Sequence, residues 1–328
     1  LRYNLCRVRG LRHMPVSVST IVPIVVLIAI GYFAVRLKLI DKPIGDFLNQ
    51  YVFVLAAPAL LFRNTAHTDI PDVIPWGLWL SYYAPIFICL IIGVLLSFMF
   101  SPRRSAVERV VIGFASGFSN TVMLGIPVIL TAFGDVASTP LFLILAFHGL
   151  LVFSSTTLIM ELMSSEPKSI GSVFVAIVKS FQTNNVLIAL LLGVIWGQTG
   201  LGIVEPIDDF LKLLGSSVIP VALIGIGATL AVTKVRQSVG EALYVSAIKL
   251  AVHPALVFVF GYYVFDLPGL WVATSTVLAG MPSGVFTSIF AHRYNADPGA
   301  ASSMIMISTL ISAGTLIVLL SLFSDYLI

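Results

Sequence analysis

Charged residues are scarce in this chain of 328 residues. Only 10% of the residues are charged and 58% are hydrophobic, and the mean hydropathy is +1.04. Soluble domains carry about 25% charged residues, and a soluble fold of this length could not bury so much apolar surface. The composition therefore excludes a soluble protein and indicates an integral membrane protein.

Cysteine is also rare, and the common catalytic and nucleotide-binding motifs are missing from the sequence. The two cysteines, Cys6 and Cys89, form neither a disulfide framework nor a metal-ligand spacing. There is no His-x-x-x-His pair, no pair of acids within an apolar run, and no Gly-x-x-x-x-Gly-Lys-Ser/Thr loop. We therefore expect no enzyme, no metal site, no cofactor and no ATP-driven pump.

Apolar runs of roughly 20 residues, the length that crosses about 30 Å of hydrocarbon as a helix, recur along the chain. Short connections with turn residues join them, and no soluble domain is inserted. We predict an all-α integral membrane protein with ten transmembrane helices. Their expected ranges are 17–36, 46–66, 76–100, 108–132, 139–163, 171–199, 207–232, 241–265, 269–291 and 299–325.

The first residues do not follow this pattern. Residues 1–13 are basic and have no membrane-spanning character, and Met14 directly precedes the first apolar run. We expect Met14 to be the natural start and residues 1–13 to be a doubtful N-terminal extension.

Lysine and arginine are unevenly distributed between the two sets of loops. Eleven lie on one side and six on the other, and four of those six fall within residues 1–13. Because short cytoplasmic loops are enriched in these residues, both termini are expected on the extracytoplasmic side of a cell membrane, such as a bacterial inner membrane. The small net charge of +3 thus reflects topology and does not indicate a nucleic-acid partner.

Proline-bearing runs recur in the same order in the two halves of the chain. Pro58 and Pro127 in the first half have counterparts in Pro220 and Pro282, at nearly the same separation. Five spans is an odd number, so the second half would lie upside down relative to the first. Prolines are common in membrane helices, so chance alignment is the alternative. The two inverted five-helix repeats are expected to span 14–165 and 166–328.

Two of the apolar runs contain a Gly-x-Pro sequence, at Gly125–Pro127 and at Gly280–Pro282. Proline removes a backbone donor and clashes with the preceding turn, so we expect helices 4 and 9 to break there. A helix that restarts at such a break directs free N–H groups and the positive end of its dipole toward it, which favours anions. Paired interrupted spans also indicate a transporter's binding site near the midplane. Replacing Pro127 or Pro282 by alanine is expected to impair transport.

Small polar residues beside these breaks complete the expected site. The predicted substrate-binding residues are Ser119, Asn120, Thr121, Pro127, Gly280, Pro282 and Ser283. The predicted gating positions are Gly125, Pro127, Gly280, Pro282, Pro58 and Pro220, of which the last two are expected to bend helices 2 and 7. Asn120 could instead hold two helices together, and a serine in a membrane helix usually bonds its own backbone.

Ionisable residues at membrane depth are few. Lys249 lies within the eighth run, where its charge costs roughly 2.5–3.5 kcal/mol. It should therefore face a cavity or a partner, unless the side chain snorkels to the interface. His148 lies centrally in the fifth run and could relay protons or bond a carbonyl. Both are candidates for ion coupling, and the sequence leaves proton and sodium coupling open.

Four stretches together resemble the auxin efflux carrier family. They are LAAPALLF at Leu55–Phe62, FSNTVMLGIPV at Phe118–Val128, PVALIGIGATL at Pro220–Leu230 and AGMPSGVFTSIFAHRYNAD at Ala279–Asp297. The resemblance implies ten helices in two inverted repeats with helices 4 and 9 broken and crossing, as in bile-acid sodium symporters. It also implies an elevator, with a scaffold of helices 1, 2, 6 and 7, and makes Asn120 the family's helix-4 asparagine. The short loops resemble prokaryotic members associated with malate and malonate.

We therefore predict a secondary active, elevator-type transporter of small organic anions, carboxylates such as malate or malonate. The anion would bind where helices 4 and 9 cross. A sodium-coupled carrier resembling the bile-acid symporters and an anion channel are the alternatives. The expected partners are the anion and the lipid bilayer, and assembly as a homodimer is left open.

Overall fold

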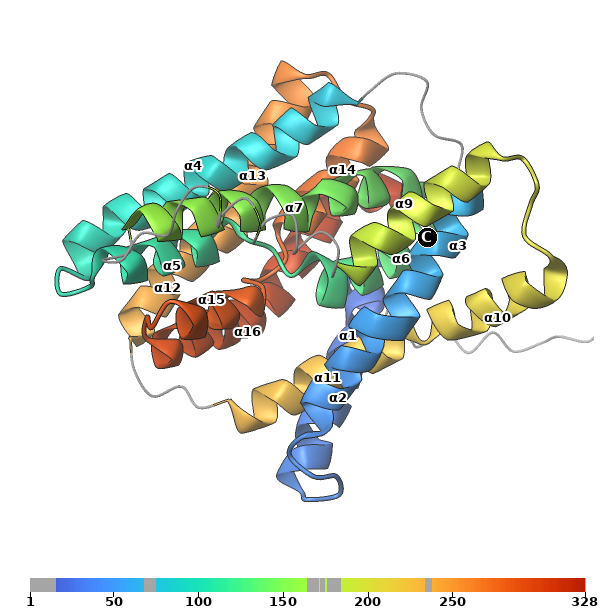
Figure 1. Ribbon diagram of the computed structural model, residues 1–328. Helices are drawn as coiled ribbons and strands as arrows, with labels where there is room; N and C mark the ends of the chain where they lie inside the picture. Colours follow the sequence, from blue (N-terminus) through green and yellow to red (C-terminus); the bar gives the residue numbers. More distant parts are fainter. Residues whose placement is uncertain are drawn as a thin grey trace, which may run out of the picture.

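The computed structural model of this chain describes residues 16–67, 75–163, 171, 175, 184–233 and 238–327. Within these residues the regular structure is helical (Figure 1). The expected extension at 1–13 and the expected boundary between the two halves at residues 165 and 166 lie outside the described residues.

The helices follow one another with short connections. In the first half they are α1 (Val16–Arg36), α2 (Ile44–Tyr51), α3 (Ala57–His67), α4 (Trp76–Phe100), α5 (Ala106–Gly117), α6 (Ile126–Phe133) and α7 (Ser138–Met163). In the second half they are α9 (Asn185–Gln198), α10 (Glu205–Ser216), α11 (Val218–Val232), α12 (Val239–Ala247), α13 (His253–Val259), α14 (Gly269–Ala279), α15 (Phe286–Arg293) and α16 (Pro298–Leu322).

Six helical stretches among the described residues are long and apolar enough to cross a membrane. They are Ile44–His67, Trp76–Phe100, Asp135–Met163, Glu205–Val232, Val239–Val264 and Pro298–Leu322. Four shorter apolar helices are Thr20–Arg36, Thr121–Phe133, Asn185–Gln198 and Gly269–Ala279. Each of these segments overlaps a different one of the expected ranges. The helical membrane-protein prediction is confirmed, whereas the ten-span count and the inverted repeat stay predictions.

Wide π-helical turns accommodate three of the prolines. Such turns, η1 (Val52–Ala56), η2 (Thr121–Gly125) and η4 (Ile248–Val252), directly precede α3, α6 and α13. Each of these helices carries a proline as its second residue, namely Pro58, Pro127 and Pro254. Proline has no N–H to donate and its ring crowds the carbonyl four residues earlier, so a wider turn relieves the clash.

Pro127 therefore lies inside a helical segment, where we had expected a break. The helix is interrupted earlier, at residues 118–120, and has already resumed as η2 when the chain reaches Pro127. Pro220 lies in the first turn of α11, directly after the bend at Ser217 that separates α10 from α11. The first turn of a helix tolerates proline because its N–H groups have no partner within the helix.

Apart from α6, which contacts helices of both groups, the helices gather into two bodies (Figure 1). One body contains α1, α2, α3, α9, α10 and α11, in which α1 packs along α11 and α3 packs along α9. A Cβ atom on Gly31 would lie 2.0 Å from the carbonyl oxygen of Ile224, and one on Gly227 would lie 1.9 Å from that of Ile28. Glycine at both positions therefore lets the backbones of α1 and α11 touch. We call this group of helices the small body.

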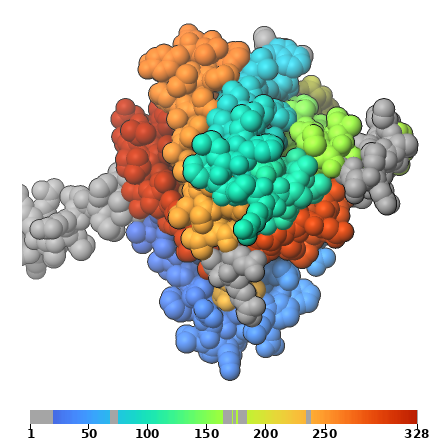
Figure 2. Space-filling view, turned by 90° about the vertical axis from the view of Figure 1, so that its left-hand side faces the viewer, coloured from blue at the N-terminus to red at the C-terminus, as the bar shows by residue number. Residues whose placement is uncertain are grey.

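The second body, which we call the large body, contains α4, α5, α7 and α12–α16. Figure 2 views it from the end where α4 passes into α5, with the blue segment of the small body below. At this end Arg104 forms ion pairs with Glu108 of α5 at 2.9 Å, with Glu241 of α12 at 2.8 Å and with Asp297 at 2.9 Å. Asp297 is also the N-cap of α16. One arginine thus joins the beginnings of three helices.

The charge of Asp297 depends on these contacts. Its partial burial opposes ionisation, but the hydrogen bonds from Arg104 and from the backbone amides of Ala300 and Gly299 outweigh that effect and lower its pKa below the ordinary value of 3.8. The carboxyl group of Asp297 is therefore ionised at neutral pH. We define the ion-pair cluster as Arg104, Glu108, Glu241 and Asp297. Such a partly buried cluster holds the three helix ends at fixed positions.

Candidate substrate site at the crossing of two interrupted helices

The first interruption separates α5 from η2. Helix α5 ends at Gly117, and Phe118 is extended with φ −78° and ψ 120°. Ser119 and Asn120 continue outside the helix, which resumes at Thr121. No proline lies in this break, so the sequence signal is the pair of short polar residues, whose side chains compete with helical hydrogen bonds.

The second interruption separates α14 from α15. Helix α14 ends at Ala279, and α15 begins at Phe286. Pro282 lies in the break itself, where it prevents the helix from continuing and pushes the residue before it toward extended geometry. Here the proline-based prediction agrees with the position of the break.

The two interruptions meet and pair through their backbones. The amide of Asn120 donates to the carbonyl of Pro282 at 2.9 Å, and the amide of Gly284 donates to the carbonyl of Phe118 at 3.2 Å. These two bonds form an antiparallel β-bridge between Ser119 and Ser283. Segments that lie 164 residues apart in the sequence are thus held together where both helices are open.

The hydroxyl groups of Ser119 and Ser283 also contact carbonyls of the opposite segment, and the two contacts are related by a local two-fold symmetry. Ser283 Oγ donates to the carbonyl of Ala115 at 2.7 Å, and Ser119 Oγ contacts the carbonyl of Ala279 at 3.5 Å. Ala115 precedes Ser119 by four residues, and Ala279 precedes Ser283 by four residues. Each serine therefore lies over the end of the helix that precedes the other interruption.

This pairing uses part of the hydrogen-bonding capacity that we had expected to face an anion. The amides of Asn120 and Gly284 bond carbonyls, and the amide of Ser283 donates to Ser308 Oγ at 3.1 Å. Ser119, Asn120 and Ser283 are all buried. They hold the crossing together.

The predicted glycines are packing positions within the same region. A Cβ atom on Gly125 would lie 2.5 Å from Leu278, and one on Gly280 would lie 2.3 Å from Leu319. Of the predicted substrate-binding residues, Thr121 alone is among the residues that line the neighbouring cavity.

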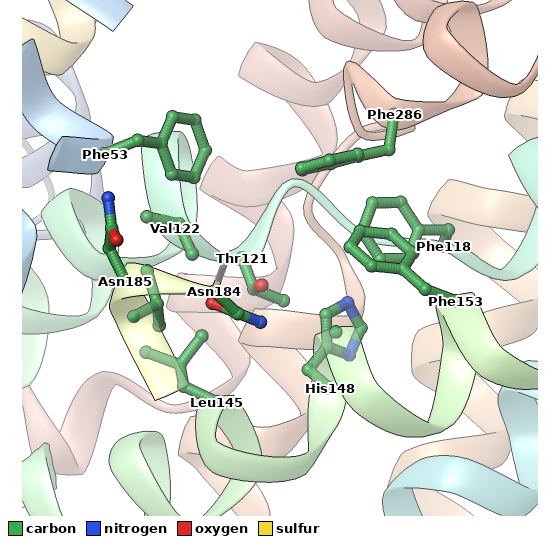
Figure 3. A pocket seen from close by; sticks show the side chains of 12 residues that line it. Phe53, Phe118, Thr121, Val122, Leu145, His148, Phe153, Asn184, Asn185 and Phe286 are labelled. Atoms are coloured by element: carbon green, nitrogen blue, oxygen red, sulfur yellow. The ribbon is translucent and has the colours of Figure 1, made fainter. Parts of the chain in front are cut away.

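A cavity of about 300 Å³ lies beside the first interruption, between the two bodies. Four phenylalanines line it: Phe53, Phe118, Phe153 and Phe286. Figure 3 shows Phe118, Phe153 and Phe286 on one side, and Val122 with Leu145 across from them. None of the described residues that line this cavity carries a fixed charge. A ligand would therefore be held by dipoles and apolar contacts.

Hydrogen-bonding groups enter the cavity from two helical segments. Thr121 begins η2, and Asn184 and Asn185 begin α9. Asn184 caps α9, because its side-chain oxygen accepts a hydrogen bond from the amide of Leu187 at 3.2 Å. The beginnings of two helical segments thus face one cavity, and helix N-termini carry partial positive charge and free N–H groups.

His148 connects the cavity to the crossing. It lies on α7, is buried, and stacks on Phe118 with ring centroids 4.8 Å apart. Its Nε2 atom lies 3.4 Å from the carbonyl oxygen of Ser119. Its Nδ1 atom has no hydrogen-bond partner among the described residues. The ring therefore has a free polar atom next to the cavity.

Lys249 lies at the other interruption. It is fully buried in η4, and its ammonium group donates to the carbonyl of Ala279, the last residue of α14. Its Nζ atom also lies 3.0 Å from Nδ1 of His253. Lys249 does not snorkel to the interface in this structure.

The sequence reading did not include Asn184, Asn185, Phe53 and Phe286 in the site. Asn184 and Asn185 fall inside the expected sixth span, and their signal is a pair of polar residues directly before an apolar run, as at a helix N-terminus. The aromatic residues carry no comparable signal, because phenylalanine is common throughout this chain. Only the fold brings these residues together at the cavity.

Apolar helices of spanning length, two interrupted helices that cross, and a cavity beside the crossing are typical of membrane transport proteins. The family model described as "Membrane transport protein" matches residues 16–320. The chain therefore belongs to this family, the auxin efflux carrier family. The four stretches that resembled the family correctly predicted this membership.

Three relatives are similar over nearly their whole length. A Rhizobium meliloti protein named "Putative malonate transporter" is 26% identical over 92% of this chain and 94% of its own. An uncharacterized transporter of Methanothermobacter thermautotrophicus is 28% identical over 90% and 95%, respectively. Auxin efflux carrier component 8 of Arabidopsis thaliana is 22% identical over 91% and 95%. The family and these relatives are transporters.

Proposed function

We propose that this protein is a secondary active transporter of small organic anions, carboxylates such as malonate or malate. The observation that carries this proposal is the meeting of the two interrupted helices at Ser119 and Ser283, directly beside a cavity of about 300 Å³. A cavity of that volume is at the small end of ligand sites and suits a molecule of few heavy atoms.

The preference for an anion rests on the helix ends at the cavity. Asn184 and Asn185 at the start of α9, and Thr121 at the start of η2, line it, and helix N-termini offer backbone N–H groups. Such groups bind carboxylates without a fixed positive charge. The malonate in the name of the Rhizobium meliloti relative supports a carboxylate as cargo.

The two bodies provide the moving parts of an elevator. Phe53 and Asn184 reach the cavity from the small body, and His148 and Phe286 reach it from the large body. A sliding of the large body against the small one would carry the anion across the membrane. The local two-fold symmetry of the serine contacts supports two inverted repeats, which are expected in this kind of carrier.

The same proposal includes the orientation in the membrane. The excess of lysine and arginine on one set of loops supports a cell-membrane protein, such as one of a bacterial inner membrane, with both termini extracytoplasmic.

Uptake of radiolabelled malonate and malate by proteoliposomes tests the function. A carrier shows saturable uptake, and Asn184→Ala should raise the apparent KM about tenfold by removing the cap of α9 and one cavity donor. Asn120→Ala should also weaken binding while the protein still inserts, because Asn120 lies in the first interruption directly before Thr121, which lines the cavity. Gln198→Ala, at the exposed far end of α9, is the matched control.

Other outcomes would change the proposal. A conductance that does not saturate would favour a channel, and uptake that requires a sodium gradient would favour a carrier of the sodium-coupled type. Unchanged uptake in both asparagine variants would remove the crossing and the cavity from the transport path.

A further inference from the structure

A buried lysine with no acidic partner among the described residues lies behind the crossing. Lys249 is fully buried, and its Nζ atom contacts the carbonyl of Ala279 and Nδ1 of His253. A cation at the C-terminal end of a helix is stabilised by the helix dipole, and the carbonyl of Ala279 ends α14. A neutral amine could donate the same hydrogen bond. The site therefore accommodates both charge states of the amine.

No carboxylate faces Lys249 from the described elements packed around η4, which are α4, α5, α12, α13 and α16. The acids of α5 and α12, Glu108 and Glu241, lie at the helix beginnings and are paired with Arg104. Helices α4, α13, α14 and α16 contain no acidic residue. The titratable groups that face Lys249 are Cys89 of α4, His253 of α13 and His148 of α7. An unpaired charge at this depth is costly, so the charge on Lys249 responds to its surroundings.

Three aromatic rings connect this lysine to the cavity. The ring of Tyr82 lies 6.0 Å from that of His253 and 5.8 Å from that of His148. All three side chains are buried, and His253 Nε2 and His148 Nδ1 each have no hydrogen-bond partner among the described residues. Buried polar atoms of this kind are rare and require an explanation. Here the three rings are successive neighbours between Lys249 and His148, which lines the cavity.

We propose that Lys249 is a proton-binding site that couples movement of the anion to movement of a proton. The inference rests on the proposed function, because the anion is the charge to which the lysine responds. On loading, the lone pair of Nζ takes a proton from water and one N–H bond forms. On the opposite side the same bond breaks and the proton returns to water, so no oxidant or further reactant is needed.

The coupling follows from electrostatics. An anion in the cavity favours the protonated amine, and the protonated amine favours the anion by the same factor. When one proton and one monoanion bind together, their charges cancel, so the large body gains no net charge. The rings of His148, Tyr82 and His253 place titratable groups between the two sites.

The first test uses the full chain in proteoliposomes with radiolabelled malonate as the probe. In wild-type protein an inward proton gradient should raise net uptake about tenfold. Lys249→Met and Lys249→Arg should lose this response but retain exchange of internal for external malonate, because exchange requires no net proton movement. Lys212→Met, an exposed lysine on α10, should behave like the wild type. Net uptake by the wild type that ignores the proton gradient would overturn the proposal.

The second test needs no substrate. The imidazole nitrogen signals of ¹⁵N-histidine-labelled protein in lipid nanodiscs are followed against pH, and the His253 signal is assigned by its loss in His253→Gln. The signal should shift with pH in the wild type and stay constant in Lys249→Met. Equal pH responses in both proteins would overturn the proton site. A wild type that transports neither malonate nor malate but retains this Lys249-dependent shift would instead refute the proposed function.

Discussion

The two interruptions use the same backbone bonds but lie in different surroundings. At residues 118–120 the chain borders the cavity, and Phe118 and Thr121 line it. The interruption after Ala279 is closed by packing, with Ser283 bonded to Ala115 and Ser308, and Lys249 over the end of α14. The first interruption is therefore suited to a ligand, and the second to holding the crossing and a charge. Local symmetry of the backbone does not imply equal roles.

Proline shows the same difference. Pro282 lies within the second interruption and its carbonyl takes part in the bridge, whereas Pro127 lies in α6 beyond a wide turn. The first break forms without proline, because the backbone groups of Phe118 and Asn120 find partners in the other break. The same Gly-x-Pro pattern in two segments of this chain therefore has two different structural consequences.

The contact between the interruptions can be disrupted most strongly at Gly284. A Cβ atom there would lie 2.4 Å from the ring of Phe118, and that ring is held between Phe114 and His148. Gly284→Val should separate the interruptions, lower stability by about 1–3 kcal/mol and reduce malonate uptake more than tenfold. Thermal unfolding and uptake measure both effects. Gly314→Val, where no atom lies within 4 Å, is the control, and equal behaviour of the two variants would contradict the tight crossing.

The ion-pair cluster joins the beginnings of α5, α12 and α16, so Arg104→Met should destabilise the large body. Removing one partner from a fully buried pair costs about 3–5 kcal/mol, and we expect about 2–3 kcal/mol for this partly buried cluster. The pKa of Asp297 is lowered, so its stabilising contribution is complete above pH 3.8 and is lost as the pH falls further. Thermal unfolding measured against pH should show that the wild type loses stability at acidic pH and that the Arg104→Met variant loses less. Arg103→Met, at an exposed neighbour, should leave both unchanged.

The smallest expected effect is the difference between alanine substitutions of Pro282 and Pro127. Pro282→Ala should reduce uptake severalfold and lower stability by about 0.4–1 kcal/mol, because a freer chain loses more entropy on folding. Pro127→Ala should change uptake less than twofold, since the wide turn before it does not form the break. Side-by-side uptake and unfolding measurements decide this. If Pro127→Ala is the more damaging substitution, the assignment of the first break to residues 118–120 is wrong.

Part of the site could be read from local patterns and part could not. Gly280–Pro282 marked the second break correctly because proline acts on its own backbone. The Gly125–Pro127 pattern predicted the first break several residues after its actual position at 118–120. The π-helical turn η2 accommodates Pro127 without a break. Asn184 and Asn185 were missed because their role depends on facing a helix more than 60 residues earlier in the chain.

Composition and apolar periodicity alone determined that this protein is a helical membrane protein, since the cost of exposing or burying each side chain depends mainly on the residue itself. Motifs also indicated its family. Only the tertiary structure decided which backbone groups pair across the crossing, which interruption borders the cavity, and that Lys249 lies at the end of α14. Those facts depend on contacts between distant segments. Local sequence does not specify which distant groups will form hydrogen bonds with the free backbone groups of an interrupted helix.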